Sequence, residues 1–297
     1  MAATDPQGDI AGPAPSELDR RLDSLTEELR QLRELIKRTY EDTQTRAVQL
    51  LAARRDAAYA AAYEENPLIS VRVGTYAGGE MLFARALASV RAQSYGNWEA
   101  IVVCDGREED VAAGIDALGD PRVRCLQRPR NGPYPEDRRA RWQVAGAHPF
   151  NEGFAAARGA WIAPIDQDDE WEPDHLEVLL GAARRSRAEL VYGVGRVRVG
   201  EDGDTYFGRW PPELGDFGFQ TALYHAGLTA FLYDANAHLL DEPADWNLAR
   251  RMLEAGVRFE FLERIVTTYF VESDAGGIEW WRARLRERGS FAGAGAS

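Results

Sequence analysis

Four acidic residues directly follow the strand-like apolar run Trp161–Ile165, namely Asp166, Asp168, Asp169 and Glu170. In an open α/β sheet, ligands bind beyond the carboxyl ends of the strands, so these carboxylates would point into a binding site. Carboxylates this close repel one another, and a divalent cation relieves that repulsion. Asp166 and Asp168 could together hold such a cation and approach the oxygens of a bound diphosphate. The alternative is a solvated acidic turn before a helix, because acidic residues favour helix N-termini.

The composition is typical of a globular protein in water. The 297 residues are 45% hydrophobic and carry a formal net charge of −13, which argues against nucleic acid or an anionic membrane surface as the main partner. No apolar run approaches the roughly 20 residues that span a bilayer, and residues 1–15 lack the basic and apolar segments of a signal peptide. Cys104 and Cys125 fit reduced thiols better than a disulfide framework, so we expect a cytoplasmic protein.

The N-terminal part of the chain predicts a helical extension. Residues 1–15 are rich in Ala, Pro, Gly and Asp and are expected to form a disordered tail. Residues 16–65 are expected to be helical, with Ser16 as the cap. The first helix has apolar residues at alternating spacings of four and three, the seam of a coiled coil: Leu18, Leu22, Leu25, Leu29, Leu32 and Ile36. This seam favours a homo-oligomer; the alternative is an amphipathic helix that packs on its own chain.

Strand-like and helix-like segments alternate after Pro67. In chain order we expect a strand at 68–73, a helix at about 80–93, a strand at 98–104, a helix near 108–118, a strand at 123–126, a helix at 151–158, the strand that ends at Asp166, a helix at 173–183, strands at 189–192 and 196–199, a helix from 244 to Gly256, and strands at 259–262 and 265–271. Alternation at this spacing predicts a parallel sheet with right-handed crossovers. Trp280 and Trp281 are expected on a short final helix.

Residues 127–150 predict a long irregular loop, because they contain four prolines. Loops of this length in a compact domain are usually functional or mobile. Arg138, Arg139 and Arg141 lie in it and could hold the phosphates of a donor or an anionic acceptor. A solvated loop is the alternative.

Four motifs in this order resemble glycosyltransferase family 2 over about residues 67–271. They are Pro67-Leu68-Ile69-Ser70-Val71 with Thr75-Tyr76 and the helix end Ser89–Glu99; the strand end Val102-Val103-Cys104-Asp105-Gly106; the acidic motif Ile165-Asp166-Gln167-Asp168-Asp169 with Trp171 and Pro173; and Ala244-Asp245-Trp246-Asn247-Leu248 with Arg251. Any one of these motifs is weak evidence, but four in register are strong.

The resemblance implies a GT-A fold, a Rossmann-like, mostly parallel α/β sheet flanked by helices, here with the N-terminal coiled-coil extension. The domain would cover residues 66–275. Its nucleotide-sugar half would be 66–170 and its acceptor half 171–275, which leaves 276–297 as a C-terminal helix and tail.

The chain departs from the family pattern at four positions. Gly74 stands where a proline is common, and Cys104 replaces a frequent aspartate. Ala244 stands where a glutamate usually precedes the catalytic base. Glu272 lies near the place where many members have a histidine, so a histidine metal ligand is not expected there.

The resemblance also implies roles for individual residues. Asp168, with Asp166, would hold Mn²⁺ or Mg²⁺, which neutralises charge on the leaving diphosphate. Asp245 would take the proton of the acceptor hydroxyl as it attacks the anomeric carbon with inversion; the alternative is an ordinary residue near a helix N-terminus. The other candidates are, on the nucleotide-sugar side, Thr75, Tyr76, Asp105, Arg158, Asp166 and Gln167, and on the acceptor side Trp171, His175 and Trp246. Arg158 could equally be an ordinary arginine at a helix end.

The expected function is metal-dependent transfer of a sugar from a nucleotide-sugar to a hydroxyl acceptor in glycan, glycolipid, peptide or natural-product biosynthesis. Asp105 at its strand end favours a uracil- or thymine-type base, with UDP as the preferred carrier. A non-catalytic oligomeric scaffold that kept the GT-A fold is the alternative; Ala244 favours it weakly, and the acidic motif and Asp245 oppose it. The sequence identifies neither the sugar nor the acceptor.

Overall fold

The computed structural model describes residues 16–76, 79–129 and 134–271. The chain divides into two compact units between Asp42 and Thr43. The predictions for residues 1–15, for Glu272 and for the C-terminal helix and tail lie outside the described residues. Among those that are described, no helix is both long enough and apolar enough to cross a membrane.

The first unit contains α1 (Glu17–Tyr40), which confirms the helix that the leucine spacing predicts. Ser16 caps it, because its hydroxyl accepts the Asp19 N–H at 3.1 Å while the Asp19 carboxylate accepts the Ser16 N–H at 2.8 Å. No residue of α1 is buried. The side chains of the leucine seam are 42–66% exposed, so the predicted self-association stays a prediction.

The helices α2 (Thr43–Ala53) and α3 (Ala57–Ala61) belong to the second unit, which also contains the sheet. Arg54 donates two hydrogen bonds of 2.6 Å to the fully buried carboxylate of Glu189. Tyr59 donates a third, at 2.9 Å. A buried carboxylate needs such partners, so these helices are part of the domain core rather than of a detachable extension.

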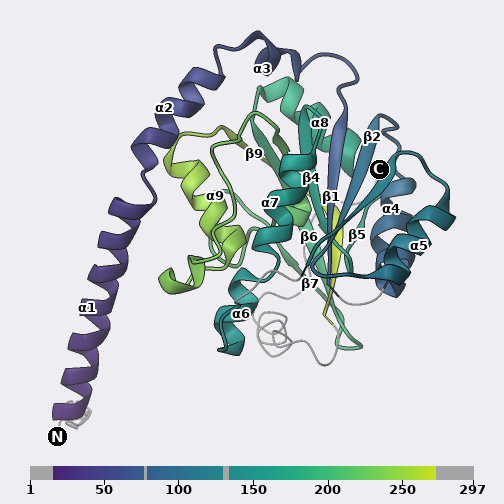
Figure 1. The fold of residues 1–297 in the computed structure, drawn as a ribbon. Helices are drawn as coiled ribbons and strands as arrows, with labels where there is room; N and C mark the ends of the chain where they lie inside the picture. The colour runs from purple at the N-terminus through teal and green to yellow at the C-terminus, as the bar shows by residue number, and fades with distance from the viewer. Residues whose placement is uncertain (1–15, 77–78, 130–133, 272–297) are drawn as a thin grey trace, which may run out of the picture. The chain divides into compact units, whose positions relative to one another are not determined.

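The strands of the second unit within the described residues are β1 (Ile69–Thr75), β2 (Trp98–Cys104), β3 (Val123–Gln127), β4 (Trp161–Asp166), β5 (Glu170–Trp171), β6 (Leu190–Val199), β7 (Asp204–Phe207), β8 (Ala222–His225) and β9 (Phe259–Val271). The helical segments that follow α3 are η1 (Leu82–Ala86), α4 (Leu87–Arg91), α5 (Glu109–Leu118), α6 (Arg138–Val144), α7 (Ala147–Ala156), α8 (His175–Ser186), η2 (Phe219–Thr221), η3 (Ala237–Leu240) and α9 (Ala244–Glu254). Figure 1 shows helices on both faces of the sheet.

The sheet has the order β3-β2-β1-β4-β8-β6-β9-β5, with β7 paired to β6. The strands β3, β2, β1 and β4 are parallel, as the sequence predicts for the first half of the domain. The second half is mixed, because β8 runs antiparallel to both β4 and β6. The carboxyl ends of β1, β2 and β4 therefore meet at one edge, where a ligand site is expected.

At two places the sequence predicts two consecutive strands where the structure has one continuous strand, β6 and β9. The sequence suggested a break at Gly193-Val194-Gly195, but β6 runs through it, with register shifts at Tyr192 and Val194. A Cβ at Gly193 would lie 2.8 Å from Val266, so glycine there permits a close approach of β9. In β9 the exposed pair Glu263 and Arg264 interrupts the apolar pattern without ending the strand.

The predicted loop at 127–150 is wrong in part, because it contains α6 and the start of α7. Asp137 caps α6 by accepting the Ala140 N–H at 2.8 Å. The prolines at 129, 133 and 135 precede this helix rather than exclude it. In α7, Pro149 lies in the first turn, where a missing N–H costs no helical hydrogen bond.

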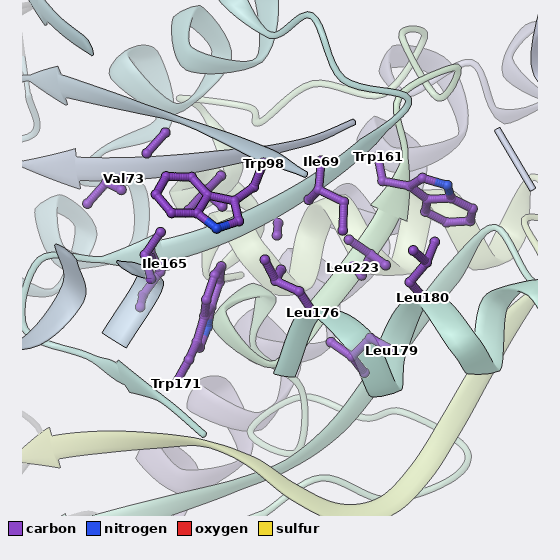
Figure 2. Close-up of a cluster of buried hydrophobic side chains, with 14 of the residues drawn as sticks. Ile69, Val73, Trp98, Trp161, Ile165, Trp171, Leu176, Leu179, Leu180 and Leu223 are labelled. Carbon is purple, nitrogen blue, oxygen red and sulfur yellow. The ribbon is translucent and has the colours of Figure 1, made fainter. Parts of the chain in front are cut away.

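The sheet is buried on both faces. On one face, alternate residues of β1 (Ile69, Val71 and Val73) join a cluster with α4, α5 and α8. Figure 2 shows Leu176, Leu179 and Leu180 of α8 among the side chains of this cluster. On the other face, Arg72 and Gly74 of β1 meet Gly153 and Phe150 of α7. A strand buried on both faces is normally apolar throughout, so the charge of Arg72 is unusual.

Candidate active site

The carboxyl ends of β1 and β2 form one side of the site. Thr75 pairs with Cys104 in their parallel register, and the Asp105 N–H donates to the Thr75 carbonyl at 2.8 Å. One oxygen of the buried Asp105 carboxylate accepts a hydrogen bond from the Tyr134 hydroxyl at 2.5 Å. The other oxygen has no partner among the described residues. Asp105 therefore retains an acceptor that could bind an N–H group of a ligand.

Gln167 ties the acidic motif to the end of β1. Its side-chain oxygen accepts hydrogen bonds from the Thr75 hydroxyl and, at 3.3 Å, from the Tyr76 N–H. Thr75 and Gln167 are buried, whereas the Tyr76 side chain is exposed. Thr75, Tyr76, Asp105 and Gln167 thus lie at one edge of the sheet, as the motifs predicted.

Carboxylates crowd at the end of β4, where the strand stops at Asp166. Burial, Asp168 and Asp245 raise the pKa of Asp166 to about 7, and Arg72 opposes this shift. Asp169 is fully buried, and neither of its carboxylate oxygens has a hydrogen-bond partner within the described part of the chain. Burial and the neighbouring carboxylates raise the pKa of Asp169 well above its usual value.

These carboxylates fit a cation site shared with a ligand. A divalent cation would remove the repulsion that raises the pKa of Asp166. Among the described residues, no group of three or more carboxylate, histidine or cysteine side chains could hold a metal ion. Asp166 and Asp168 would therefore supply no more than two protein ligands. Mg²⁺ is commonly held in this way, by one or two carboxylates together with substrate phosphates.

Asp245 lies in the first turn of α9. Phe219 and Tyr233 line the same cavity as Asp245. Burial raises the pKa of Asp245, while the charge of Arg72 and hydrogen bonding to Phe219 and Tyr233 oppose the shift. A carboxylate with a raised pKa is a stronger base, which suits proton abstraction near neutral pH.

The acidic motif and Asp245 meet in space. Asp166 and Asp245 line the same cavity, together with Arg72, Phe150 and Tyr233 among others, and its volume is about 10 Å³. A space of this size holds about one water. The site therefore places carboxylates that could bind a cation beside a carboxylate that could accept a proton from a hydroxyl group.

A larger hollow of about 820 Å³ lies elsewhere, between α8 and residues 262–264 of β9. Its lining includes Tyr95, Glu177, Arg184, Leu262 and Arg264, and none of the predicted site residues. Polar side chains of both charges surround it, and it is separate from the carboxyl ends of the strands.

The family model for glycosyl transferase family 2 matches residues 70–135 and 137–244, which is more than half of the chain. The chain belongs to glycosyltransferase family 2. The match includes Thr75, Asp105 and the acidic motif and ends one residue before Asp245. It confirms the family that the four motifs suggested.

Known relatives agree with this assignment. The chain is similar to the putative colanic acid biosynthesis glycosyl transferase WcaA of Escherichia coli K12, with 35% identity over 120 residues. The match covers 39% of this chain and 38% of WcaA. The matches therefore span well under half the length of the first curated relatives. These relatives agree with the family match.

Solved structures show the same fold. Staphylococcus aureus TarS 1–349, in complex with UDP, has a TM-score of 0.51 at 16% identity, over 69% of this chain and 60% of that one. The mannosyltransferase PcManGT from Pyrobaculum calidifontis, in complex with GDP-Man and Mn²⁺, has a TM-score of 0.54 at 16% identity, over 82% and 72%. The family 2 domain here thus has the GT-A fold.

Arg158 lies away from the donor edge. Of the two roles that the sequence left open, contact with the diphosphate or an ordinary arginine at a helix end, the structure favours the second, because its guanidinium pairs with Glu99 at 2.6 Å. Glu99 lies opposite Ser70 near the start of β1, whereas the donor edge is at Thr75. Five residues of strand separate the two by about 16 Å. Arg158 therefore stabilises the amino-terminal edge of the sheet.

The three residues expected on the acceptor side are packed into the structure. His175 is fully buried, stacks on Trp171 with ring centroids 4.1 Å apart, and shares a hydrogen bond of 2.9 Å with the Val266 carbonyl. Figure 2 places Trp171 among the buried side chains of the core. Trp246 is half-buried against the opposite core cluster. The burial of Trp171 and His175 argues against direct contact with an acceptor.

Arg72 and Tyr233, which both line the cavity beside Asp245, were not expected there from the sequence. One signal for Arg72 was available, because a single arginine interrupts the apolar strand Leu68–Val73. Tyr233 lies in an irregular segment between β8 and η3, where no periodicity marks it. Only the fold brings it next to α9.

Proposed function

We propose that this glycosyltransferase is metal-dependent and inverting, and that it moves a sugar from a UDP-linked donor to a hydroxyl acceptor. The observation that carries the proposal is the shared cavity of Asp166 and Asp245. It puts the diphosphate side of a donor and the base for an acceptor within one site. Taken alone, Asp166 could belong to an acidic turn before a helix, and Asp245 could be an ordinary residue near a helix N-terminus.

The donor base would bind at the carboxyl ends of β1 and β2. The oxygen of Asp105 that has no partner among the described residues would accept the ring N–H of a uracil, and the exposed Tyr76 could cover the base. TarS, which shares the fold, is in complex with UDP. PcManGT, in complex with GDP-Man, shows that a GT-A fold also accepts a guanine nucleotide, so GDP is the competitor to test.

Asp166 and Asp168 would hold Mn²⁺ or Mg²⁺ with the donor diphosphate. The cation would neutralise charge that develops on the leaving diphosphate. Asp245 would take the proton of the acceptor hydroxyl during attack on the anomeric carbon. In-line attack inverts that carbon, as the family implies. The name of WcaA supports a glycan-forming pathway as the context of the acceptor.

We also infer that α1 pairs in parallel with α1 of a second copy. In the heptad set by the leucine seam, Leu22, Leu29 and Ile36 occupy the a positions. Glu28 then falls at a g position and Arg33 at the next e position. In two parallel helices, Glu28 of one copy would lie near Arg33 of the other, and their opposite charges would attract. A centred antiparallel pairing would instead bring the two Glu28 side chains together.

The test is nucleotide binding by thermal unfolding, with UDP, GDP and dTDP, each with and without Mn²⁺. We expect UDP with Mn²⁺ to raise Tm most, and EDTA to remove most of the shift. Transfer from UDP-sugars to an acceptor panel would follow. Stabilisation by GDP alone would contradict the proposed donor, and equal UDP binding in EDTA would contradict metal dependence.

A further inference from the structure

Arg72 lies buried in the middle of β1 and is 2% exposed. Its stem passes Gly153 of α7, where an added Cβ would lie 2.6 Å from the Arg72 Cγ. Its guanidinium carbon lies 3.9 Å from the centroid of the Phe150 ring and 5.0 Å from that of Tyr233. A buried arginine is costly unless its charge and its N–H groups are used.

The hydrogen bonds around Tyr233 have a definite direction. Nη2 of Arg72 donates to the Tyr233 hydroxyl at 3.3 Å, because a guanidinium can only donate. The hydroxyl oxygen is thus the acceptor of that bond, and its own proton is available to Asp245, which lines the same cavity. Burial raises the pKa of Tyr233 well above its usual value, so the hydroxyl keeps this proton.

Asp245 depends on these neighbours for its orientation. Pro243, at the N-cap of α9, provides no side-chain cap for the helix. The groups beside its carboxylate come from other segments, because Phe219 of η2 and Tyr233 line the same cavity, and hydrogen bonding to them lowers the pKa of Asp245. Removal of one donor should let the carboxylate rotate away from the cavity that it shares with Asp166.

We propose that Arg72 is a positioning residue for the catalytic base, acting on Asp245 through the hydroxyl of Tyr233. Arg72 fixes the Tyr233 proton toward Asp245, and its charge balances the carboxylates of Asp166 and Asp245 that line the same cavity. Nε and Nη1 of Arg72 have no protein partner within the described residues, and the cavity has room for a water that could satisfy them. This inference rests on the proposed function, because it takes Asp245 as the base.

The first experiment needs no activity. Arg72→Met removes the charge and retains a long apolar stem, and its Tm is measured in the wild-type and in the Asp245→Asn background. We expect a fall of roughly 5–10 °C in the wild type and a clearly smaller fall in Asp245→Asn, because the uncompensated carboxylate has gone. Asp105→Asn is the matched control, since it neutralises another buried carboxylate at the end of β2. Equal falls in all three backgrounds would overturn the coupling of Arg72 to Asp245.

The second experiment separates positioning from folding. Tyr233→Phe removes a single hydroxyl and retains the buried ring. We expect its kcat for sugar transfer to fall at least tenfold, while UDP affinity stays within twofold of wild type. Arg72→Lys should retain more turnover than Arg72→Met at equal UDP affinity, because it keeps a donor and a charge. A structural role alone would reduce the fraction of protein that binds UDP by the same factor as turnover.

The outcomes distinguish this inference from the proposed function. If the wild type neither binds nor turns over any sugar nucleotide, the proposed function fails, while the Tm measurements still decide whether Arg72 supports Asp245. If the wild type transfers sugar and Tyr233→Phe does so at the same rate, the proposed function stands. The positioning role of Arg72 is then wrong.

Discussion

The guanidinium of Arg72 lies 3.3 Å from the hydroxyl of Tyr233, and both residues line the same cavity as Asp245. This contact links the first strand of the sheet to the segment beside the start of α9. Asp166, at the end of β4, lines the cavity as well. The residue proposed as the base and a residue proposed to bind the cation thus share one buried arginine.

Asp245→Asn should separate binding from catalysis. The substitution is nearly isosteric and removes only the basic oxygen, so UDP affinity should stay close to that of wild type. Loss of a general base typically lowers turnover about 10²–10⁴-fold. The measurement is sugar transfer beside UDP affinity in the same preparation. Transfer at the wild-type rate would mean that another carboxylate is the base, with Asp241 or Glu242 as the next candidates.

Asp168→Asn should act only through the cation. Without metal, its affinity for UDP should equal that of wild type, because the Asp105 side of the site is untouched. With Mn²⁺, the gain in affinity should be largely lost, and turnover should fall with it. Titration of UDP by calorimetry with and without Mn²⁺ checks this. Asp174→Asn is the matched control, because Asp174 pairs with Arg264 beside the larger hollow instead.

Asp105→Ala should weaken nucleotide binding with and without metal alike. One oxygen of its buried carboxylate, at the end of β2, has no hydrogen-bond partner among the described residues. Tyr134→Phe removes the hydroxyl that binds the other oxygen of Asp105 and should have the smaller effect. Affinities of UDP and uridine, measured side by side, test this pair. Unchanged uridine affinity in Asp105→Ala would remove Asp105 from the base site.

The first half of the domain was predictable because each strand there is a continuous apolar run. The carboxyl ends of parallel strands meet at one edge, so Thr75, Asp105 and Asp166 could be brought together from the sequence alone. The second half was less predictable. The strands β6 and β9 continue through glycines and charged residues, because pairing with neighbouring strands outweighs local preference.

Two candidate residues lie away from the site for a common physical reason. Arg158 and His175 lie close in sequence to the acidic motif, but a strand and a helix start carry them away from the site edge. Conversely, Arg72 and Tyr233 are far from Asp245 in sequence, and only tertiary packing brings them together. Sequence spacing predicts which residues share an element, but not the contacts between elements that complete a site.

His175 should make the protein less stable in acid. Burial lowers the pKa of His175 to about 3, below its ordinary value of 6.5. The unfolded chain therefore binds a proton that the folded chain excludes, and stability falls as the pH drops below about 6.5. The slope should be about 1.4 kcal/mol per pH unit, or about 2–3 kcal/mol by pH 4.5.

The measurement is urea unfolding between pH 7 and pH 4.5 for wild type and His175→Phe, which retains a ring to stack on Trp171. The free energy of unfolding of the variant should depend less on pH by that amount, whatever its absolute value. The exposed His148, changed to Phe, is the matched control. Parallel pH profiles for wild type and His175→Phe would contradict a neutral, buried His175.

The leucine seam of α1 should make the chain a dimer. A fragment that starts at Thr43 removes α1 and retains Arg54 and Tyr59, which bind the buried Glu189. A fragment that starts near residue 66 would also remove those partners of Glu189. A change in its sedimentation could then come from misfolding rather than from the loss of dimerisation. Sedimentation should give a dimer for the full chain and a monomer for residues 43–297.

A point variant tests the seam without truncation. Leu29→Asp puts a charge at a central a position and should give a monomer, because a buried, unpaired carboxylate is costly. Gln31→Asp introduces the same residue two positions later, outside the seam, and should remain a dimer. UDP binding should be equal in all these forms, because the site lies within the second unit. A full chain that sediments as a monomer, or a Leu29→Asp variant that sediments as a dimer, would exclude this seam as the interface.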